Sequence, residues 1–262
     1  MCLIAVAWQV HPRFGLALIA NRDEFHARPA APAQPWDDAP ALYGGRDLEA
    51  GGAWLLASTA GRLAAVTNVR TGVPATAPRS RGALVRGFAD GVATGAAYDA
   101  ALAPIAPEFG HYNLLAWDGA RLQFASNHPQ ATDFAVAPGM HAMSNGAFDA
   151  DWPKSGHATR ALRGWLASPA SQRGALEMSD LEPLLAALSD TTPAPDAALP
   201  DTGVGLEMER WLSPPFVRGG RYGTRCSTVV LVEADAMVFA ERRYGPDGRP
   251  QGDSCVRLPL SP

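Results

Sequence analysis

Apolar residues gather in short runs that alternate with turn-forming residues along the whole chain. The first two runs, Cys2–Val10 and Gly15–Ala20, are nearly continuous in apolar residues, and a turn-like segment that starts at His11 separates them. Runs of this kind predict strands whose sheet is covered on both faces. The chain is therefore expected to open with a β-hairpin.

Three more pairs of runs follow the same pattern, each interrupted by a short turn rich in Gly, Asp or Ala. They are Ala53–Ser58 with Arg62–Asn68, Tyr112–Trp117 with Arg121–Ser126, and Val229–Glu233 with Met237–Glu241. Short turns between strand-like runs are typical of hairpins. Repeated hairpins predict an extensive antiparallel sheet system.

Segments with the residue spacing of helices lie between these hairpins. The segments Ser80–Asp90, Trp152–Ala167 and Ser179–Leu188 carry apolar residues at helical intervals. Pro153 suits the first turn of the second helix, and Ser179 with Glu182 matches a capping box for the third. Helices grouped between runs of hairpins indicate an α+β fold with helices packed outside the sheets.

Two proline-rich stretches, Arg28–Pro40 and Asp190–Gly205, are predicted to be irregular. No repeat or boundary divides the chain, so residues 1–262 are expected to form a single domain.

Composition narrows the class of protein. Apolar residues make up 47% of the chain and charged residues 18%, which is typical of a globular protein. A net charge of −4 favours neither nucleic acid nor an anionic membrane as a partner. No run of 18 apolar residues predicts a membrane span, and the N-terminus lacks the pattern of a signal peptide. These features predict a cytoplasmic protein and leave the oligomeric state open.

The three cysteines are Cys2, Cys226 and Cys255, and no CxxC spacing occurs. This low, odd count argues against a disulfide framework or a structural zinc site. A reducing compartment would keep Cys2 as a thiol.

Cys2 follows the initiator methionine directly, and aminopeptidases readily remove a methionine that precedes a small side chain. The new N-terminal residue would carry a free α-amine with a pKa of about 7.7–8.0 and a thiol with a pKa of about 8.5. Enzymes use such a pair as nucleophile and base in acyl transfer. Cysteine is also commonly a buried apolar residue, so this hypothesis needs partners elsewhere.

The opening hairpin supplies those partners. Antiparallel pairing through a loop near residues 11–14 brings the end of the second strand, Asn21-Arg22-Asp23, beside Cys2. A carboxylate there can orient the α-amine, and a guanidinium can favour the thiolate. Asp23 and Arg22 are the stronger candidates, and Asn21 is a weaker one.

Further polar residues end or begin other strands. Asn68 could donate its amide to a developing oxyanion, and Asn145 has the same possible role. Arg225 opens an apolar strand. Each of these residues could equally be structural.

Aromatic residues could line a pocket for an apolar group. Phe25, Trp36 and Trp54 are the candidates for substrate contacts, together with Asn21. Most tryptophans in a chain of this size serve core packing.

The chain resembles the NRDE family, also called the transport and Golgi organisation family. The resemblance rests on several motifs, taken in order along most of the chain: Met1-Cys2, Asn21-Arg22-Asp23-Glu24, Gly44-Gly45-Arg46-Asp47, Gly51-Gly52-Ala53-Trp54-Leu55, Ala64–Asn68, Arg81-Gly82, Tyr112-Asn113-Leu114, Ser144-Asn145, Trp152-Pro153-Lys154 and Tyr222-Gly223-Thr224-Arg225.

That family is in turn similar to N-terminal nucleophile hydrolases of the choloylglycine hydrolase and penicillin V acylase type. The resemblance implies a four-layer αββα sandwich of two antiparallel sheets. It also implies the following roles: Cys2 as nucleophile, Arg22 and Asp23 at the end of the second strand, Asn68 in the oxyanion hole, Asn145 near the α-amine, and Arg225 as the late arginine. The adjacency of Arg22 and Asp23 departs from those hydrolases, in which residues intervene.

Two functions follow from the resemblance. The first is hydrolysis of a non-peptide C–N amide bond in a small acylated substrate, which requires no metal or organic cofactor. The second is a carrier without enzymatic activity, because the family is linked to haem movement, lipid metabolism and secretory organisation. Haem would need an axial ligand such as Cys2, His26, His111 or His157.

A metal-dependent hydrolase that uses Asp23, Glu24, Asp47 and Glu49 is a weaker possibility, because no ligand spacing supports it. Nucleotide binding is weaker still, since neither GxxxxGK nor GxGxxG occurs.

Overall fold

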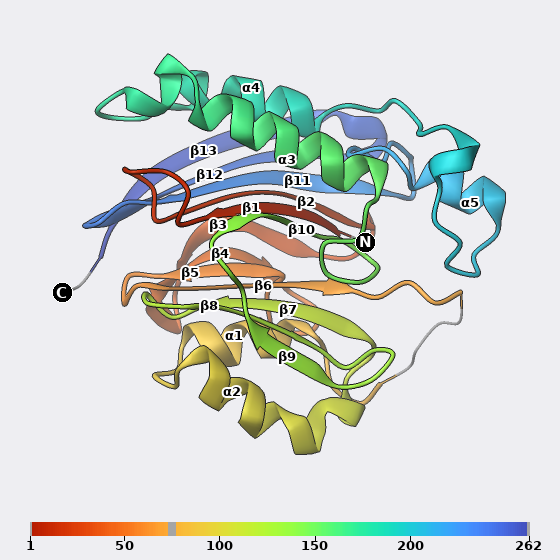
Figure 1. Cartoon of the computed structure of the whole chain (residues 1–262), viewed down its shortest axis with the longest axis horizontal. Coiled ribbons are helices and arrows are strands. Elements are labelled where there is room, and N and C mark those ends of the chain that lie inside the picture. The colour runs from red at the N-terminus through yellow and green to blue at the C-terminus, as the bar shows by residue number, and fades with distance from the viewer. Residues whose placement is uncertain (1, 73–76, 261–262) are drawn as a thin grey trace. The chain divides into compact units, whose positions relative to one another are not determined.

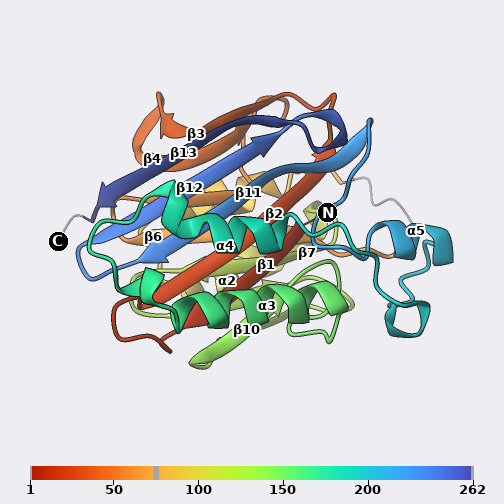
Figure 2. The ribbon, with the colours of Figure 1, turned by 90° about the horizontal axis from the view of Figure 1, so that it is seen from above.

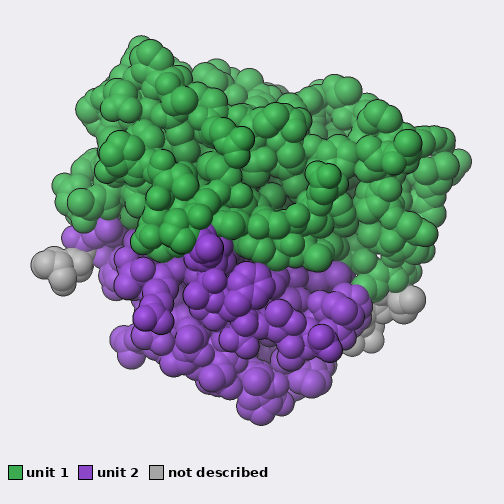
Figure 3. Space-filling model, in the orientation of Figure 1, with its two compact units in different colours: residues 1–27, 70–73, 138–259 green, residues 28–69, 74–137, 260–262 purple. Residues whose placement is uncertain are grey.

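The computed structural model describes residues 2–72 and 77–260. Their contacts divide the chain into two compact units, which Figure 3 colours separately. The first unit contains residues 1–27, 70–73 and 138–259, and the second contains residues 28–69, 74–137 and 260–262. Whether they act as the single domain expected from the sequence stays a prediction.

The first unit is built on a six-stranded antiparallel sheet in the order β10-β1-β2-β11-β12-β13. The elements of this unit are β1 (Cys2–Trp8), β2 (Leu16–Phe25), β10 (Gly139–Met143), β11 (Tyr222–Val232), β12 (Ala236–Tyr244), β13 (Pro250–Pro259), α3 (Pro153–Leu166), α4 (Met178–Leu188), α5 (Leu206–Trp211) and the 3₁₀-helices η2 (Pro169–Gln172), η3 (Asp196–Ala198) and η4 (Pro246–Gly248). Helices α3 and α4 lie side by side over one face of this sheet (Figures 1 and 2).

Alternation along the strands creates the core beneath these helices. Leu3, Ala5 and Ala7 of β1 point to the same face, where they pack with Leu162 of α3 and Leu185 of α4. Every residue of β1 is buried, so both faces of this strand are covered, as its apolar run predicts.

The second unit is built on a seven-stranded antiparallel sheet in the order β3-β4-β5-β6-β7-β8-β9. Its elements are β3 (Ala30–Trp36), β4 (Ala39–Asp47), β5 (Leu55–Ser58), β6 (Arg62–Asn68), β7 (Tyr112–Trp117), β8 (Leu122–Ser126), β9 (Thr132–Ala135), α1 (Gly82–Ala89), α2 (Gly95–Leu102) and the 3₁₀-helix η1 (Ala103–Glu108). Leu84 and Phe88 of α1 and Leu102 of α2 pack into the core of this unit. The predicted α+β class, with antiparallel sheets flanked by helices, is confirmed.

All four predicted hairpins are present, with small shifts at their ends. The largest shift is in β11, which was expected from Val229 but begins at Tyr222, because it stays paired with β2 as far as Phe25. Asn21, Arg22 and Asp23 lie in the buried part of β2 near its end, as expected from the opening hairpin.

The prediction of an irregular segment at Arg28–Pro40 is wrong, because this segment forms β3 and the start of β4. Strand β3 is at the edge of its sheet and its register shifts between Ala31 and Gln34. Edge strands and bulges tolerate proline because some backbone N–H groups there need no partner. The segment Asp190–Gly205 is irregular apart from η3, as predicted.

The predicted capping box at Ser179 and Glu182 is also wrong. Helix α4 begins earlier, and the capping box is formed by Glu177 and Asp180. The backbone N–H of Glu177 donates to Asp180 at 3.0 Å. Pro153, in contrast, occupies the first turn of α3 as predicted.

Two glycine motifs of the second unit meet where α1 begins. A Cβ atom placed on Gly52 would lie 2.4 Å from the carbonyl carbon of Gly82, and the backbone N–H of Ala53 donates to the Gly82 carbonyl at 3.3 Å. Only glycine at position 52 allows this approach without moving the backbone of α1.

We therefore expect Gly52→Ala to lower the free energy of unfolding by about 1–3 kcal/mol, since the added methyl overpacks a backbone contact. Urea denaturation would measure this loss. The matched control is Gly164→Ala, at an exposed position in α3 with open space around it, which should raise stability by about 0.5–1 kcal/mol. Equal effects of the two variants would contradict the proposed contact.

Candidate active site

Strand pairing sets the position of Cys2. Cys2 of β1 lies opposite Arg22 of β2, and Arg22 lies opposite Cys226 of β11. Because side chains alternate between the faces of a sheet, these three residues share the face opposite α3 and α4. Cys2 and Arg22 are only 7% and 9% exposed.

The Cys2 thiol is held close to the backbone of β2. Burial raises its pKa and the nearby Asp23 carboxylate raises it further, whereas Arg22 and a hydrogen bond from the Asp23 backbone lower it. The net direction is upward, so the thiol is protonated at neutral pH. The Ser144 hydroxyl donates to the Cys2 carbonyl at 2.8 Å and so ties the start of β1 to the end of β10.

The carboxylate of Asp23 is buried beside β11. The Thr224 hydroxyl donates to Asp23 Oδ1 at 2.6 Å, and the Tyr222 hydroxyl donates to the Asp23 carbonyl at 3.2 Å. Burial raises the pKa of this carboxyl group, while Lys154, Thr224 and Arg22 oppose the shift. Burial likewise raises the pKa of Tyr222 well above its ordinary value.

Lys154, the only lysine in the chain, is buried at the start of α3. Its Nζ donates to the Leu212 carbonyl at 3.2 Å and lies 5.7 Å from the ring centroid of Trp152. Burial lowers the pKa of Lys154 to about 8, although Asp23 and Cys2 act to raise it. Asp23 and Lys154 are thus both buried, and each shifts the pKa of the other in the direction that favours its charged form.

A buried ion pair lies next to Trp152. Arg70 Nη1 and Glu209 Oε2 are 3.0 Å apart, although their alignment is poor for a hydrogen bond. The Arg70 guanidinium lies 5.1 Å from the Trp152 ring centroid, and Thr202 donates to Glu209 through both its backbone N–H and its hydroxyl. Arg70 also lowers the pKa of Lys154, so the pair belongs to the electrostatic surroundings of the site.

Asn21, for which the sequence suggested a substrate contact, is hydrogen-bonded inside the first unit. Its side-chain amide donates to the carbonyls of Leu188 and Pro215, both at 2.8 Å, and accepts from the Ser227 hydroxyl at 2.6 Å. Asn21 is fully buried. Its side chain therefore fastens β2 to the end of α4.

The other predicted residues of the first unit surround this strand end. Asn145 is fully buried, and its carbonyl accepts from the Arg70 backbone at 2.8 Å. Arg225 occupies a bulge in β11, from which its guanidinium donates to the Phe25 carbonyl at 2.8 Å. The Phe25 ring is 54% exposed and packs edge-on against Tyr222.

Asn68, Trp36 and Trp54 belong to the second unit. Asn68 is the last residue of β6 and lies opposite Tyr112. Trp36 is a core residue whose indole N–H donates to the Gly44 carbonyl at 3.1 Å. Trp54 is half-buried, and its carbonyl accepts from the Val66 backbone at 2.8 Å.

The carboxylates of the weaker metal hypothesis have other partners. Asp47 and Glu49 both bind Arg28, at 2.7 and 3.3 Å. Across residues 2–72 and 77–260, no group of three or more His, Cys, Asp or Glu side chains is arranged to hold a metal ion.

Two of the histidines suggested as haem ligands use a ring nitrogen for a backbone contact. Nε2 of His26 lies 3.1 Å from the Gly219 carbonyl, and Nε2 of His157 lies 3.0 Å from the Ala187 carbonyl. The His111 ring packs against the His128 ring in the second unit, with the ring centroids 4.3 Å apart. Among the residues that the structure describes, no helix is long and apolar enough to span a membrane.

Sequence patterns alone did not point to Lys154, Thr224 or Ser144 as residues of the site. All three lie in motifs that carried the family resemblance, and a lone lysine next to Trp152 and Pro153 was a visible signal. Their roles became apparent only when β10, β11 and α3 were placed around β2.

Two antiparallel sheets flanked by helices place the chain in the α+β class. Two solved structures align with it at low identity. A Caenorhabditis elegans N-acylethanolamine-hydrolyzing acid amidase ortholog has a TM-score of 0.48 and 11% identity, over 88% of this chain and 92% of its own. The C2A mutant of the conjugated bile acid hydrolase from Clostridium perfringens has a TM-score of 0.49 and 10% identity, over 98% and 92%.

The chain belongs to the Transport and Golgi organisation 2 (TANGO2) family, which matches residues 1–246. The Transport and Golgi organization protein 2 homolog of Bos taurus is 32% identical over 264 residues, and that of Homo sapiens is 30% identical over 262 residues. Each alignment covers 92% of both chains. The family resemblance read from the sequence is confirmed.

The lowered pKa of Lys154 predicts a pH-dependent stability. The folded chain releases the proton near pH 8, whereas the unfolded chain keeps it up to about 10.5. The unfolded state therefore binds more protons in this window, and the contribution of Lys154 to stability rises with pH, by up to about 3 kcal/mol in all.

Urea denaturation of the wild type and Lys154→Met across this window would isolate the effect. The free energy of unfolding of the wild type should increase relative to that of the variant as pH rises. Arg160→Met, which removes an exposed cation from the same helix, should give a constant difference. A constant difference for Lys154→Met would show that this lysine is not buried as described.

Proposed function

We propose that this chain is a hydrolase of C–N amide bonds in small acylated molecules, with Cys2 as the nucleophile. The observation that carries the proposal is the buried Cys2 thiol at a strand end, hydrogen-bonded by the backbone of Asp23, whose carboxylate is under the influence of Lys154. Thiol nucleophiles in acyl transfer require such a combination of a fixed sulfur and adjacent ionisable groups.

The raised pKa of the thiol makes a base necessary. A buried, protonated cysteine is a poor nucleophile until its proton is removed. Removal of Met1 would leave the α-amine on Cys2 itself, and this amine can accept the thiol proton without any further residue. Asp23 would then orient the resulting ammonium group by charge.

The proposed reaction has two halves. The α-amine takes the thiol proton while the Cys2 sulfur forms a bond to the substrate carbonyl carbon. The tetrahedral intermediate then collapses as the nitrogen of the leaving group takes that proton, the C–N bond breaks and a thioester remains. Water, deprotonated by the same amine, cleaves the thioester, releases the acid and returns the thiol.

Lys154 is proposed to act on Asp23. A buried carboxylate tends to take up a proton, and a neutral Asp23 could not stabilise an ammonium group. The positive charge of Lys154 opposes this uptake. The assignment of Asn68 to the oxyanion rests on the sequence resemblance alone.

Loss of the Cys2 thiol should abolish turnover. With acyl p-nitroanilides of short, medium and long chain length as substrates, Cys2→Ala should lower kcat by at least about 10³-fold, since the nucleophile is gone. Cys255→Ala, which removes a thiol from the edge strand β13, should keep the wild-type rate. Mass spectrometry of wild type mixed with substrate should find the acyl group on Cys2.

If wild type cleaves none of these amides and no acyl group appears on Cys2, the hydrolase proposal fails. The carrier function read from the family resemblance would then be the remaining hypothesis.

Blocking the α-amine gives an independent test. A chain with an N-terminal extension ahead of Cys2 should be inactive, because its Cys2 nitrogen is an amide and cannot accept a proton. Cutting the extension off directly before Cys2 should restore activity, and intact mass would verify the new terminus. Full activity in the extended chain would exclude the α-amine as the base.

A further inference from the structure

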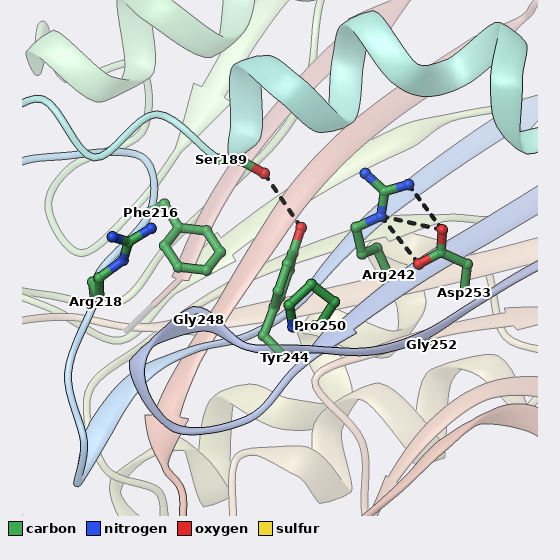
Figure 4. A pocket seen from close by; sticks show the side chains of 9 residues that line it. All are labelled: Ser189, Phe216, Arg218, Arg242, Tyr244, Gly248, Pro250, Gly252 and Asp253. Atoms are coloured by element: carbon green, nitrogen blue, oxygen red, sulfur yellow. Dashed lines mark hydrogen bonds and ion pairs between the residues drawn. The ribbon is translucent and has the colours of Figure 1, made fainter.

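A cavity of about 520 Å³ lies in the first unit and shares no residue with the Cys2 cluster. Its volume falls within the range of small-molecule sites, about 300–1,000 Å³. It is lined by Ser189, Phe216, Arg218, Arg242, Tyr244, Gly248, Pro250, Gly252 and Asp253 (Figure 4).

The cavity lies where the register between β12 and β13 shifts. The register shifts between Arg243 and Tyr244, and η4 bridges the two strands there. Gly248 has a φ of +74°, and a Cβ at this position would lie 3.0 Å from the Phe216 ring. This glycine therefore keeps that side of the cavity open.

Phe216 and Tyr244 form a fixed aromatic corner. Their ring centroids are 4.8 Å apart and the rings are nearly perpendicular, at 88°. The Phe216 backbone donates to the Asp190 carbonyl at 2.9 Å, which anchors the loop after α5 to the end of α4. The Tyr244 hydroxyl lies 3.3 Å from the Ser189 hydroxyl and 3.5 Å from that of Ser227.

The two arginines that line the cavity differ in their partners. Arg242 is held by Glu182 and Asp253, with N–O distances of 3.0 and 2.8 Å, so its charge is neutralised. Arg218 is exposed, and its guanidinium makes no hydrogen bond or ion pair with any residue that the structure describes. Figure 4 shows the two side chains on opposite sides of the Tyr244 ring. Arg218 therefore supplies the available positive charge.

We propose that this cavity binds a small planar apolar molecule that carries one carboxylate or phosphate group. The anionic group pairs with the planar fork of Arg218, which suits both anions. The apolar body packs against Pro250 and the Phe216–Tyr244 corner. The Ser189 hydroxyl, which donates its proton to the Leu185 carbonyl at 2.8 Å, can accept a hydrogen bond from a polar atom on that body. The site does not depend on the hydrolase chemistry proposed for Cys2.

The test is a titration of the isotope-labelled full chain, followed by NMR, with benzoate and phenyl phosphate as probes. At least one of the two should bind saturably, with the largest shifts at Ser189, Phe216 and Tyr244. Inorganic phosphate and benzyl alcohol, which lack the ring or the charge, should bind at least about tenfold more weakly. A comparison of the affinities for benzoate and phenyl phosphate identifies the preferred anion.

Arg218→Gln should weaken binding of the preferred probe at least about tenfold. The matched control is Arg221→Gln, at an exposed arginine that does not line the cavity, and its affinity should equal that of the wild type. The proposal is overturned if neither anion saturates, if shifts lie elsewhere, if the two variants bind alike, or if inorganic phosphate or benzyl alcohol binds as well as the aromatic anions.

Discussion

Burial of a polar strand end is the constraint on which the rest of the first unit depends. Strand β2 runs between β1 and β11, and it carries Asn21, Arg22 and Asp23 in its buried part. Each polar group in such a position costs free energy unless it finds a partner. The Asn21 side chain makes hydrogen bonds with Leu188, Pro215 and Ser227. These hydrogen bonds fix α4 and the following loop over the sheet.

The same burial sets the charge balance around Cys2. Desolvation raises the pKa of Cys2 and Asp23 and lowers that of Lys154, so every group is pushed toward its neutral form. Mutual attraction between Asp23 and Lys154 acts in the opposite direction. Ionisable groups whose pKa values are shifted in this way are typical of functional sites, and structural ion pairs also cause such shifts.

Local patterns predicted most of the fold, and contacts between distant segments explain the rest. The four hairpins and the start of α3 follow from short apolar runs, tight turns and Pro153, which act over a few residues. The proline-rich strand β3 was missed because its place at a sheet edge depends on β4. The cap of α4 was misplaced because Glu177 competes locally with Ser179.

The sequence predicted the neighbourhood of Cys2 with Arg22 and Asp23, because these residues lie on one hairpin. The first turn brings Cys2, Arg22 and Asp23 together, so the geometry of a hairpin was enough to predict that they are neighbours. Nearly all of the second unit's sequence separates Lys154 from Asp23, and burial, which no short pattern encodes, lowers the pKa of Lys154. Desolvation is a property of the packed unit. Cys2, Asp23 and Lys154 therefore come under one another's electrostatic influence only when β10, β11 and α3 pack around β2.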